Sequence, residues 1–116
     1  MEIRIVKDSI SRKELADMAR GQFGDFVKAA VDIEQGIMAL GGELHMDEAV
    51  TLVEREGSKH ERVWGVNLYC DKTGEEFIEF DSMINLKPAL GNRSRGVESE
   101  EVRVNIREVI NKLVAS

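Results

Sequence analysis

The stretch from residue 26 to residue 46 constrains the fold most, because its apolar residues recur at every second position. Apolar and polar side chains alternate from Val27 to Ile33, and the pair Gln35-Gly36 follows. Alternation with period two is typical of a half-buried strand, and glycine supplies the positive φ that a tight turn needs. We predict a hairpin whose second strand runs to Met46, with Gly41-Gly42 as a bulge. Strands joined by a tight turn are antiparallel, which favours an antiparallel sheet.

Caps and turns mark the other elements. Residues 2–7 alternate as a short strand. Ser11 and Glu14 form a capping box that begins a helix, and Ser99 caps a last helix with a continuous apolar stripe. Asp47 is the expected N-cap of a third helix, which ends at Gly57. A second hairpin is predicted from two apolar stretches joined by a polar turn, Val63–Cys70 and Phe77–Lys87.

The predicted order of elements is β-α-β-β-α-β-β-α. Both strand pairs are closed by short turns, which favours a mostly antiparallel five-stranded sheet with about three helices on one of its faces. The fold class is therefore α+β. The 116 residues suit one domain, so we assign residues 1–116 to a single α+β domain.

Charge, cysteine content and the lengths of the apolar runs limit the partners and the location that we expect. The chain has 22 acidic and 16 basic residues, and its formal charge of -6 makes nucleic acid an unlikely partner, because a phosphate backbone is held by clustered Lys and Arg. The single cysteine, Cys70, cannot form an internal disulfide. The N-terminal residues lack the apolar region of a signal peptide, and no apolar run approaches the roughly 18 residues of a membrane span. We expect a cytoplasmic protein with no membrane partner.

Four sequence blocks carry a resemblance. They are IMALGGELHMDEA, VWGVNLYCD, IEFDSMINLKP and GNRSRGVE, and their shorter cores are GGELH, WGxNLY, FDSMIN and GNRSR. In their order and spacing they resemble an uncharacterised family of short prokaryotic proteins, a domain of unknown function, over roughly Ile10 to Leu113. The resemblance implies no activity and assigns no catalytic residue. Members of that family have proline after the tyrosine, where Cys70 stands here, so Cys70 is not expected to be a required thiol.

The first candidate site consists of Glu43, His45 and Asp47. On an extended strand these alternate residues would share one side at roughly 7 Å steps. Imidazole and carboxylate groups suit a divalent metal ion, the one cofactor that the sequence suggests, and histidine also suits general-base chemistry. The alternative is structural, with Asp47 capping a helix, Glu43 solvated and His45 half-buried in a strand.

The second candidate is a polar sheet face. Asn67 and Asn85 interrupt apolar runs although asparagine is depleted in strands, and their neighbours on this face are Tyr69, Glu79 and Asp81. The amides would orient a small ligand or support the histidine by hydrogen bonds. The alternative is a solvated face of a one-sided sheet.

The third candidate is the loop Gly91–Gly96, which contains Asn92, Arg93 and Arg95. Arginine offers paired donors in a fixed geometry, so the loop would recognise a phosphate or a carboxylate. In an acidic chain the two arginines have an alternative role, pairing with internal acids. The expected internal partners are Glu43, Glu79 and Asp81.

The leading functional hypothesis is a binding domain for a small polar ligand or a protein partner. One alternative is a metal-assisted hydrolase that uses Glu43, His45 and Asp47, and another is a structural homodimer formed through a free sheet edge with Met38 and Met46. The sequence leaves open whether the protein is an enzyme. The ligand-binding candidates are Glu43, His45, Asn67, Asn85, Asn92, Arg93 and Arg95.

Overall fold

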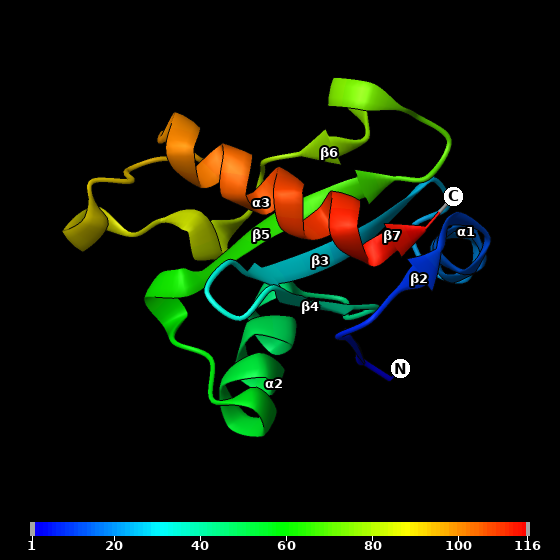
Figure 1. The fold of residues 1–116 in the computed structure, drawn as a ribbon, viewed down its shortest axis with the longest axis horizontal. Helices are drawn as coiled ribbons and strands as arrows, with labels where there is room; N and C mark the ends of the chain where they lie inside the picture. Colours follow the sequence, from blue (N-terminus) through cyan, green and yellow to red (C-terminus); the bar gives the residue numbers. More distant parts are fainter. Residues whose placement is uncertain (1, 116) are drawn as a thin grey trace.

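The computed structural model describes residues 2–115 and confirms the α+β class. A five-stranded antiparallel sheet has the order β1-β4-β3-β5-β6, and three helices pack around it (Figure 1). Two further short strands, β2 and β7, form a separate parallel pair. The bounds are β1 Arg4–Val6, β2 Ile10–Ser11, α1 Arg12–Arg20, β3 Phe26–Asp32, β4 Ile37–Leu40, α2 His45–Glu56, β5 Val63–Tyr69, β6 Ile78–Glu79, α3 Glu100–Leu113 and β7 Val114–Ala115.

The hairpin β3–β4 forms as predicted, and a buried carboxylate stabilises its turn. Asp32 Oδ1 accepts hydrogen bonds from the backbone N–H groups of Glu34 and Gln35, at 2.8 and 3.0 Å. Asp32 Oδ2 accepts from Ser58 Oγ at 2.6 Å. Gly36 has φ +71°, the left-handed conformation that the turn requires. The turn is therefore fixed by hydrogen bonds among its own residues and by one from Ser58, which follows α2.

The second strand of this hairpin is shorter than predicted. β4 ends at Leu40, and the extension to Met46 is wrong. Gly41 has φ +89° and directs the chain out of the sheet, so Gly41-Gly42 ends the strand and is not a bulge within it. The N–H of Gly42 then donates to a side chain of α2, Glu48 Oε2, at 2.9 Å instead of to a neighbouring strand.

The helix caps follow the sequence in two cases of three. Ser11 and Glu14 form the expected capping box of α1, and Ser99 Oγ accepts from the N–H of Val102 at the start of α3. In α2 the N-cap is Leu44, which has no side-chain cap hydrogen bond, and Asp47 lies inside the first turn. The prediction that Asp47 is the N-cap is therefore wrong. Within residues 2–115 no helix is long and apolar enough to cross a membrane.

The second hairpin is also shorter than predicted. β5 runs as expected to Tyr69, but β6 contains only residues 78–79, so the strand Phe77–Lys87 is wrong beyond Glu79. The following residues form a 3₁₀ turn, η3, over Met83–Asn85. The side chain of Asn85 takes the place of a strand beside β5, because its amide pairs with both the N–H and the C=O of Gly65.

The helices cover both faces of the sheet, contrary to the prediction of one face. α1 and α3 contribute Leu15 and Ile110 to one core, whereas α2 packs Ala49 and Leu52 against the opposite face. Figure 1 shows β3 and β4 between α3 and α2. Both faces of these strands are apolar, and small residues such as Ala30 allow α2 to pack closely. Trp64 is buried in the same core as Leu15 and Ile110.

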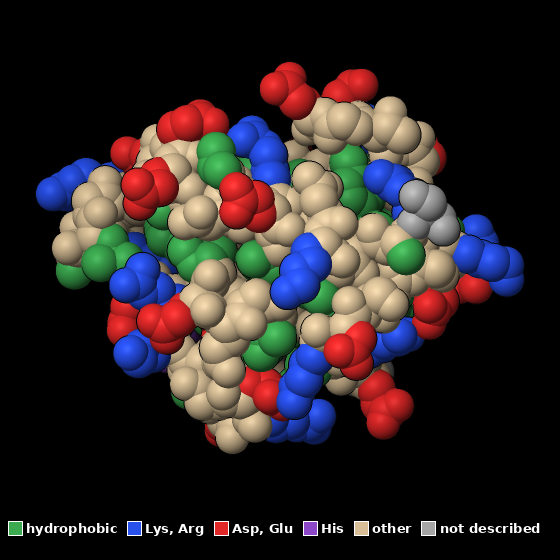
Figure 2. Space-filling view, viewed as in Figure 1, with side chains coloured by type: hydrophobic (Ala, Val, Ile, Leu, Met, Phe, Trp, Pro, Cys, Tyr) green, Lys and Arg blue, Asp and Glu red, His purple; other side chains and the backbone are tan. Residues whose placement is uncertain are grey.

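Two surface features bear on partners. Figure 2 shows acidic and basic side chains interspersed over the visible face of the molecule. Met38 is fully buried in the core, so it is not available for the homodimer interface to which the sequence assigned it, whereas Met46 is exposed. Self-association through a sheet edge stays a prediction.

Candidate functional site

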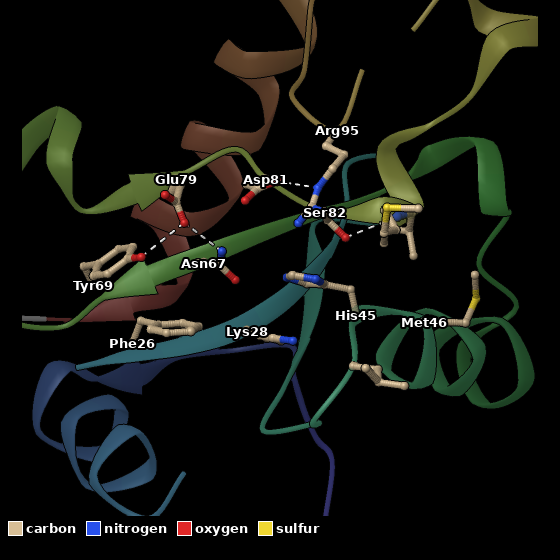
Figure 3. A pocket seen from close by; sticks show the side chains of 13 residues that line it. Phe26, Lys28, His45, Met46, Asn67, Tyr69, Glu79, Asp81, Ser82 and Arg95 are labelled. Atoms are coloured by element: carbon tan, nitrogen blue, oxygen red, sulfur yellow. Dashed lines mark hydrogen bonds and ion pairs between the residues drawn. The ribbon is translucent and has the colours of Figure 1, made fainter. Parts of the chain in front are cut away.

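A cavity of about 810 Å³ lies on the face of the sheet that α2 covers only in part. β3 and β5 form its floor, the first turn of α2 forms one side, and the segment after β6 forms the other (Figure 3). Ligand sites in proteins commonly have volumes of roughly 300–1,000 Å³. The cavity contains three of the predicted ligand-binding residues, His45, Asn67 and Arg95.

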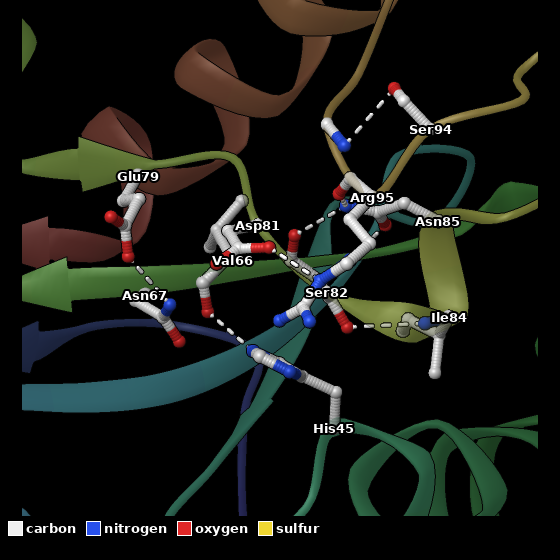
Figure 4. Close-up of polar contacts among 12 residues, drawn as sticks. His45, Val66, Asn67, Glu79, Asp81, Ser82, Ile84, Asn85, Ser94 and Arg95 are labelled. Carbon is white, nitrogen blue, oxygen red and sulfur yellow. Dashed lines mark hydrogen bonds and ion pairs between the residues drawn. The ribbon is translucent and has the colours of Figure 1, made fainter.

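His45 begins α2 and lies buried at the floor of this cavity. Its Nε2 is 2.9 Å from the carbonyl oxygen of Val66 in β5 (Figure 4). Burial holds the pKa of His45 below its usual value, and the charge of Lys28 lowers it further, against the opposing effects of Val66 and Asn67. The ring is therefore neutral at pH 7. Because a carbonyl oxygen only accepts, Nε2 carries the proton, and Nδ1 is left as a hydrogen-bond acceptor.

The metal hypothesis requires Glu43, His45 and Asp47 to alternate on one strand, and they do not. Glu43 lies in the loop before α2, and both Glu43 and Asp47 are exposed while His45 is buried. Over residues 2–115, no group of three or more His, Cys, Asp or Glu side chains is arranged to hold a metal ion. The geometry thus offers no support to the divalent metal or to the hydrolase built on it.

Asn67 and Glu79 form a polar pair on the floor of the cavity, as the sequence placed them. Asn67 Nδ2 donates to Glu79 Oε1 at 2.8 Å, and Tyr69 Oη donates to the same oxygen at 3.2 Å. Asn67 is buried, and its Oδ1 has no hydrogen-bond partner in the described part of the chain. An unpaired buried acceptor costs about 1–3 kcal/mol, and its burial keeps this oxygen from being satisfied by solvent.

Asn85 was also predicted to bind a ligand, but its contacts serve the fold. Its Oδ1 accepts from the N–H of Gly65 at 2.8 Å, and its Nδ2 donates to the carbonyls of Gly65 and Arg95 at 3.0 and 2.9 Å. These bonds join β5 to the loop that carries Arg95. Asn85 is fully buried and does not line the cavity.

Asn92 organises the loop Gly91–Gly96, here called the arginine loop, and it also does so through side-chain hydrogen bonds to the backbone. Its Nδ2 donates to the carbonyls of Asn85, Ser94 and Gly96, and its Oδ1 accepts from the N–H of Glu98. The side chain is buried, and its donors and its acceptor are engaged within the loop. These contacts favour a structural role for Asn92, which fixes the direction in which the loop presents its arginines.

The structure separates the two arginines of the loop. Arg95 lines the cavity, and its Nε donates to Asp81 Oδ1 at 2.8 Å, one of the internal partners expected from the sequence. Arg93 does not line the cavity, and its backbone N–H donates to Glu98 Oε2 at 2.8 Å. The predicted acidic partners are thus right for Arg95 and wrong for Arg93.

Sequence reasoning missed Lys28 and the apolar rim. Lys28 lies opposite Asn67 in the β3–β5 pair, so only the strand register brings the two together. The rim consists of three exposed side chains at the cavity mouth, Leu44, Met46 and Met83. Met46 and Met83 are close in space because η3 packs against α2. In the sequence these three residues look like ordinary apolar positions of the predicted strands, so nothing set them apart as a surface.

The fold and the site define a small α+β domain in which a cavity of mixed polarity occupies the uncovered part of one sheet face. The chain belongs to a family described as a protein of unknown function (DUF5674), whose sequence model matches residues 4–113. The expected resemblance to a domain of unknown function is therefore confirmed. No curated protein and no solved structure matches the chain.

A buried carboxyl group supports the loop that leads to His45, and its effect on stability is testable. Glu48 is fully buried, and burial raises its pKa well above the ordinary 4.5. The folded chain therefore binds this proton more tightly than the unfolded chain, so the wild type loses stability as the pH rises above the unfolded pKa. Glu48→Gln should thus become progressively more stable than wild type between pH 4 and pH 8, as measured by urea denaturation.

The control for this prediction is Glu54→Gln, which changes an exposed residue of the same helix. Its stability difference from wild type should stay nearly constant over the same pH range. If the difference for Glu48→Gln is equally constant, the buried carboxyl group is not protonated in the folded protein.

Proposed function

We propose that this protein is a binding module whose small polar ligand occupies the cavity beside α2. The observation that carries the proposal is the polar floor of the cavity. His45 and Asn67 are both buried there, and Asn67 Oδ1 lacks a hydrogen-bond partner among residues 2–115. A few placed polar groups in an otherwise apolar cavity are typical of small-molecule sites, where they fix the orientation of the ligand.

The surroundings of this floor support the proposal. The rim residues Leu44, Met46 and Met83 are 56%, 49% and 62% exposed, so they offer an apolar surface at the cavity mouth. Methionine is common at surfaces that adapt to a ligand, because its side chain is flexible and polarisable. The floor supplies directional hydrogen bonds, and the rim supplies apolar contact. This combination favours a ligand with a polar group attached to an apolar body.

A protein partner is the second candidate, and the rim is the observation that favours it. Exposed Met and aromatic side chains are enriched at protein interfaces. A partner that covered the rim would bury apolar surface but would make no contact with the polar floor unless one of its side chains entered the cavity. A small ligand accounts for both features, so we rank it first.

The proposal predicts that binding is lost when the cavity mouth is filled. Titration of ¹⁵N-labelled protein with a library of small polar fragments should give saturable shift changes for residues around the cavity. Met46→Trp adds bulk at the mouth and should weaken binding of such fragments at least about tenfold, because the ligand loses space and apolar contact.

The matched control is Val104→Trp, which places the same side chain at a 39% exposed position on α3. Fragment affinity should stay within about twofold of wild type, since Val104 does not line the cavity. If no fragment shifts the cavity residues, or if both tryptophan variants weaken binding equally, the cavity is not the binding site.

A further inference from the structure

Two cationic side chains enter the cavity with hydrogen-bond donors still unused. Arg95 uses Nε to bond Asp81, and neither of its Nη atoms has a partner in the range 2–115. Lys28 Nζ donates to the carbonyl of Glu43 at 2.9 Å and lies 5.0 Å from the centroid of the Phe23 ring, which leaves two of its three hydrogens without a hydrogen-bond partner within residues 2–115. Figure 3 shows Arg95 and Lys28 on either side of His45. The cavity therefore holds a planar fork of donors and a second positive charge across from it.

The first turn of α2 adds to this positive field. Leu44, His45 and Met46 line the cavity, and the N-cap position has no side-chain hydrogen bond. Amide N–H groups in the first turn of a helix have no partner within the helix, and the helix dipole places partial positive charge there. The amide groups at the end of α2 would thus also favour a negatively charged ligand group beside Arg95 and Lys28, against the opposing charge of the exposed Asp47 in the same turn.

The acidic residues of the cavity limit how much negative charge it will accept. Glu79 Oε1 already receives two hydrogen bonds, and Asp81 is engaged by Arg95, but both carboxylates remain charged neighbours. Two cations and two anions leave the lining with no net charge. A second negative charge therefore gains no net attraction from the lining but costs more solvation on burial, so a dianion such as phosphate is less favoured than a monoanion. A carboxylate also matches the fork of arginine with two parallel hydrogen bonds.

We propose that the ligand is a monocarboxylate with an apolar body. Its carboxylate lies between Arg95 and Lys28, and its apolar body contacts the rim formed by Leu44, Met46 and Met83. This inference rests on the proposed function and specifies the chemical class of the ligand. It also separates Arg95, which recognises the ligand, from Arg93 on the same loop, which does not.

The test uses compounds that differ in one feature at a time. 3-Phenylpropanoate carries the carboxylate and the apolar body, 3-phenylpropanamide keeps the body without the charge, 3-phenylpropyl phosphate carries more charge, and acetate lacks the body. Each is titrated into ¹⁵N-labelled wild-type protein. We expect 3-phenylpropanoate to bind roughly tenfold more tightly than the amide, because only the carboxylate offers two acceptor oxygens to the arginine fork and carries a charge opposite to those of Arg95 and Lys28. Acetate and the phosphate should bind more weakly than 3-phenylpropanoate.

Variants assign the carboxylate to its partners. Arg95→Met and Lys28→Met should each weaken 3-phenylpropanoate roughly three- to tenfold and weaken the amide by a smaller factor, because the amide has no charge to lose. Arg95→Lys keeps the charge without the planar fork, so its affinity should lie between those of wild type and Arg95→Met. Arg93→Met is the matched control and should bind like wild type. Melting temperatures verify folding, and the exposed Arg95–Asp81 pair is not expected to contribute much to them.

The outcomes separate this inference from the proposed function. The inference is overturned if the amide or the phosphate binds as well as 3-phenylpropanoate, or if Arg93→Met weakens binding as much as Arg95→Met. If other fragments bind in the cavity but none of these carboxylates does, the binding module stands and the ligand class is wrong. If no compound of any class shifts the cavity residues, both fail.

Discussion

Asn85→Asp should lower the free energy of unfolding by about 3–5 kcal/mol at pH 7, the usual cost of an uncompensated buried charge. The new oxygen replaces Nδ2, which donates to the carbonyls of Gly65 and Arg95, and would face both of these acceptors. Asn85 is fully buried, so solvent cannot relieve the repulsion. Urea denaturation of the variant and the wild type measures the effect.

The pH dependence of this variant has a definite sign. A buried carboxyl group surrounded by acceptors holds its proton more tightly in the folded chain, so the stability deficit should shrink as the pH falls toward 4. The control is Asn111→Asp at an exposed position of α3, where the change in stability should be within about 0.5 kcal/mol. A deficit that is small, or that does not vary with pH, would mean that Asn85 does not hold β5 and the arginine loop together.

Gly65→Ala should lower the free energy of unfolding by about 1–3 kcal/mol through overpacking. A Cβ at this position would lie 2.5 Å from both Cβ and Oγ of Ser82 and 3.1 Å from Cδ2 of His45. Ser82 is buried and cannot move into solvent, so either β5 or the segment after β6 must shift. Because His45 is part of the same contact, backbone amide shifts should change at the start of α2 as well.

The control for this prediction is Gly21→Ala at the end of α1. Gly21 has φ -78°, and a Cβ there would be 3.6 Å from its nearest neighbour, an ordinary contact. Thermal and urea denaturation should show little change for this variant. Equal stability of Gly65→Ala and wild type would indicate that Ser82 and β5 are not packed as closely as described.

The elements that were predictable from the sequence are those with local causes. The capping box of α1 and most of the hydrogen bonds of the β3–β4 turn depend on residues close in the chain, and both formed as expected. The ends of β4 and β6 were wrong because side chains from other elements decide them. Glu48 takes the N–H of Gly42, and the amide of Asn85 pairs with the backbone of Gly65. Bonds of this kind leave no periodic signal.

Some residues of the candidate site were predictable from the sequence, and others were not. Asparagine in an apolar strand was sufficient to single out Asn67, which lies in the cavity. The same rule also selected Asn85, because a buried amide that replaces a strand has the same sequence signature as one that binds a ligand. Lys28 requires the register of β3 and β5, and Arg93 and Arg95 differ only in the direction that the loop gives them. These features depend on tertiary structure.

The parallel pair β2–β7 has a consequence for how the chain folds during synthesis. Ile10 pairs with Val114, and α3 supplies Ile106 and Ile110 to the core under the sheet. The early strands can therefore not bury their α3-facing side until the residues of α3 and β7 have left the ribosome. Contacts so distant in sequence slow folding and expose apolar strands meanwhile. Nascent chains that stop before residue 100 should remain protease-sensitive on the ribosome, whereas chains that present residues 100–115 outside the ribosome should become resistant.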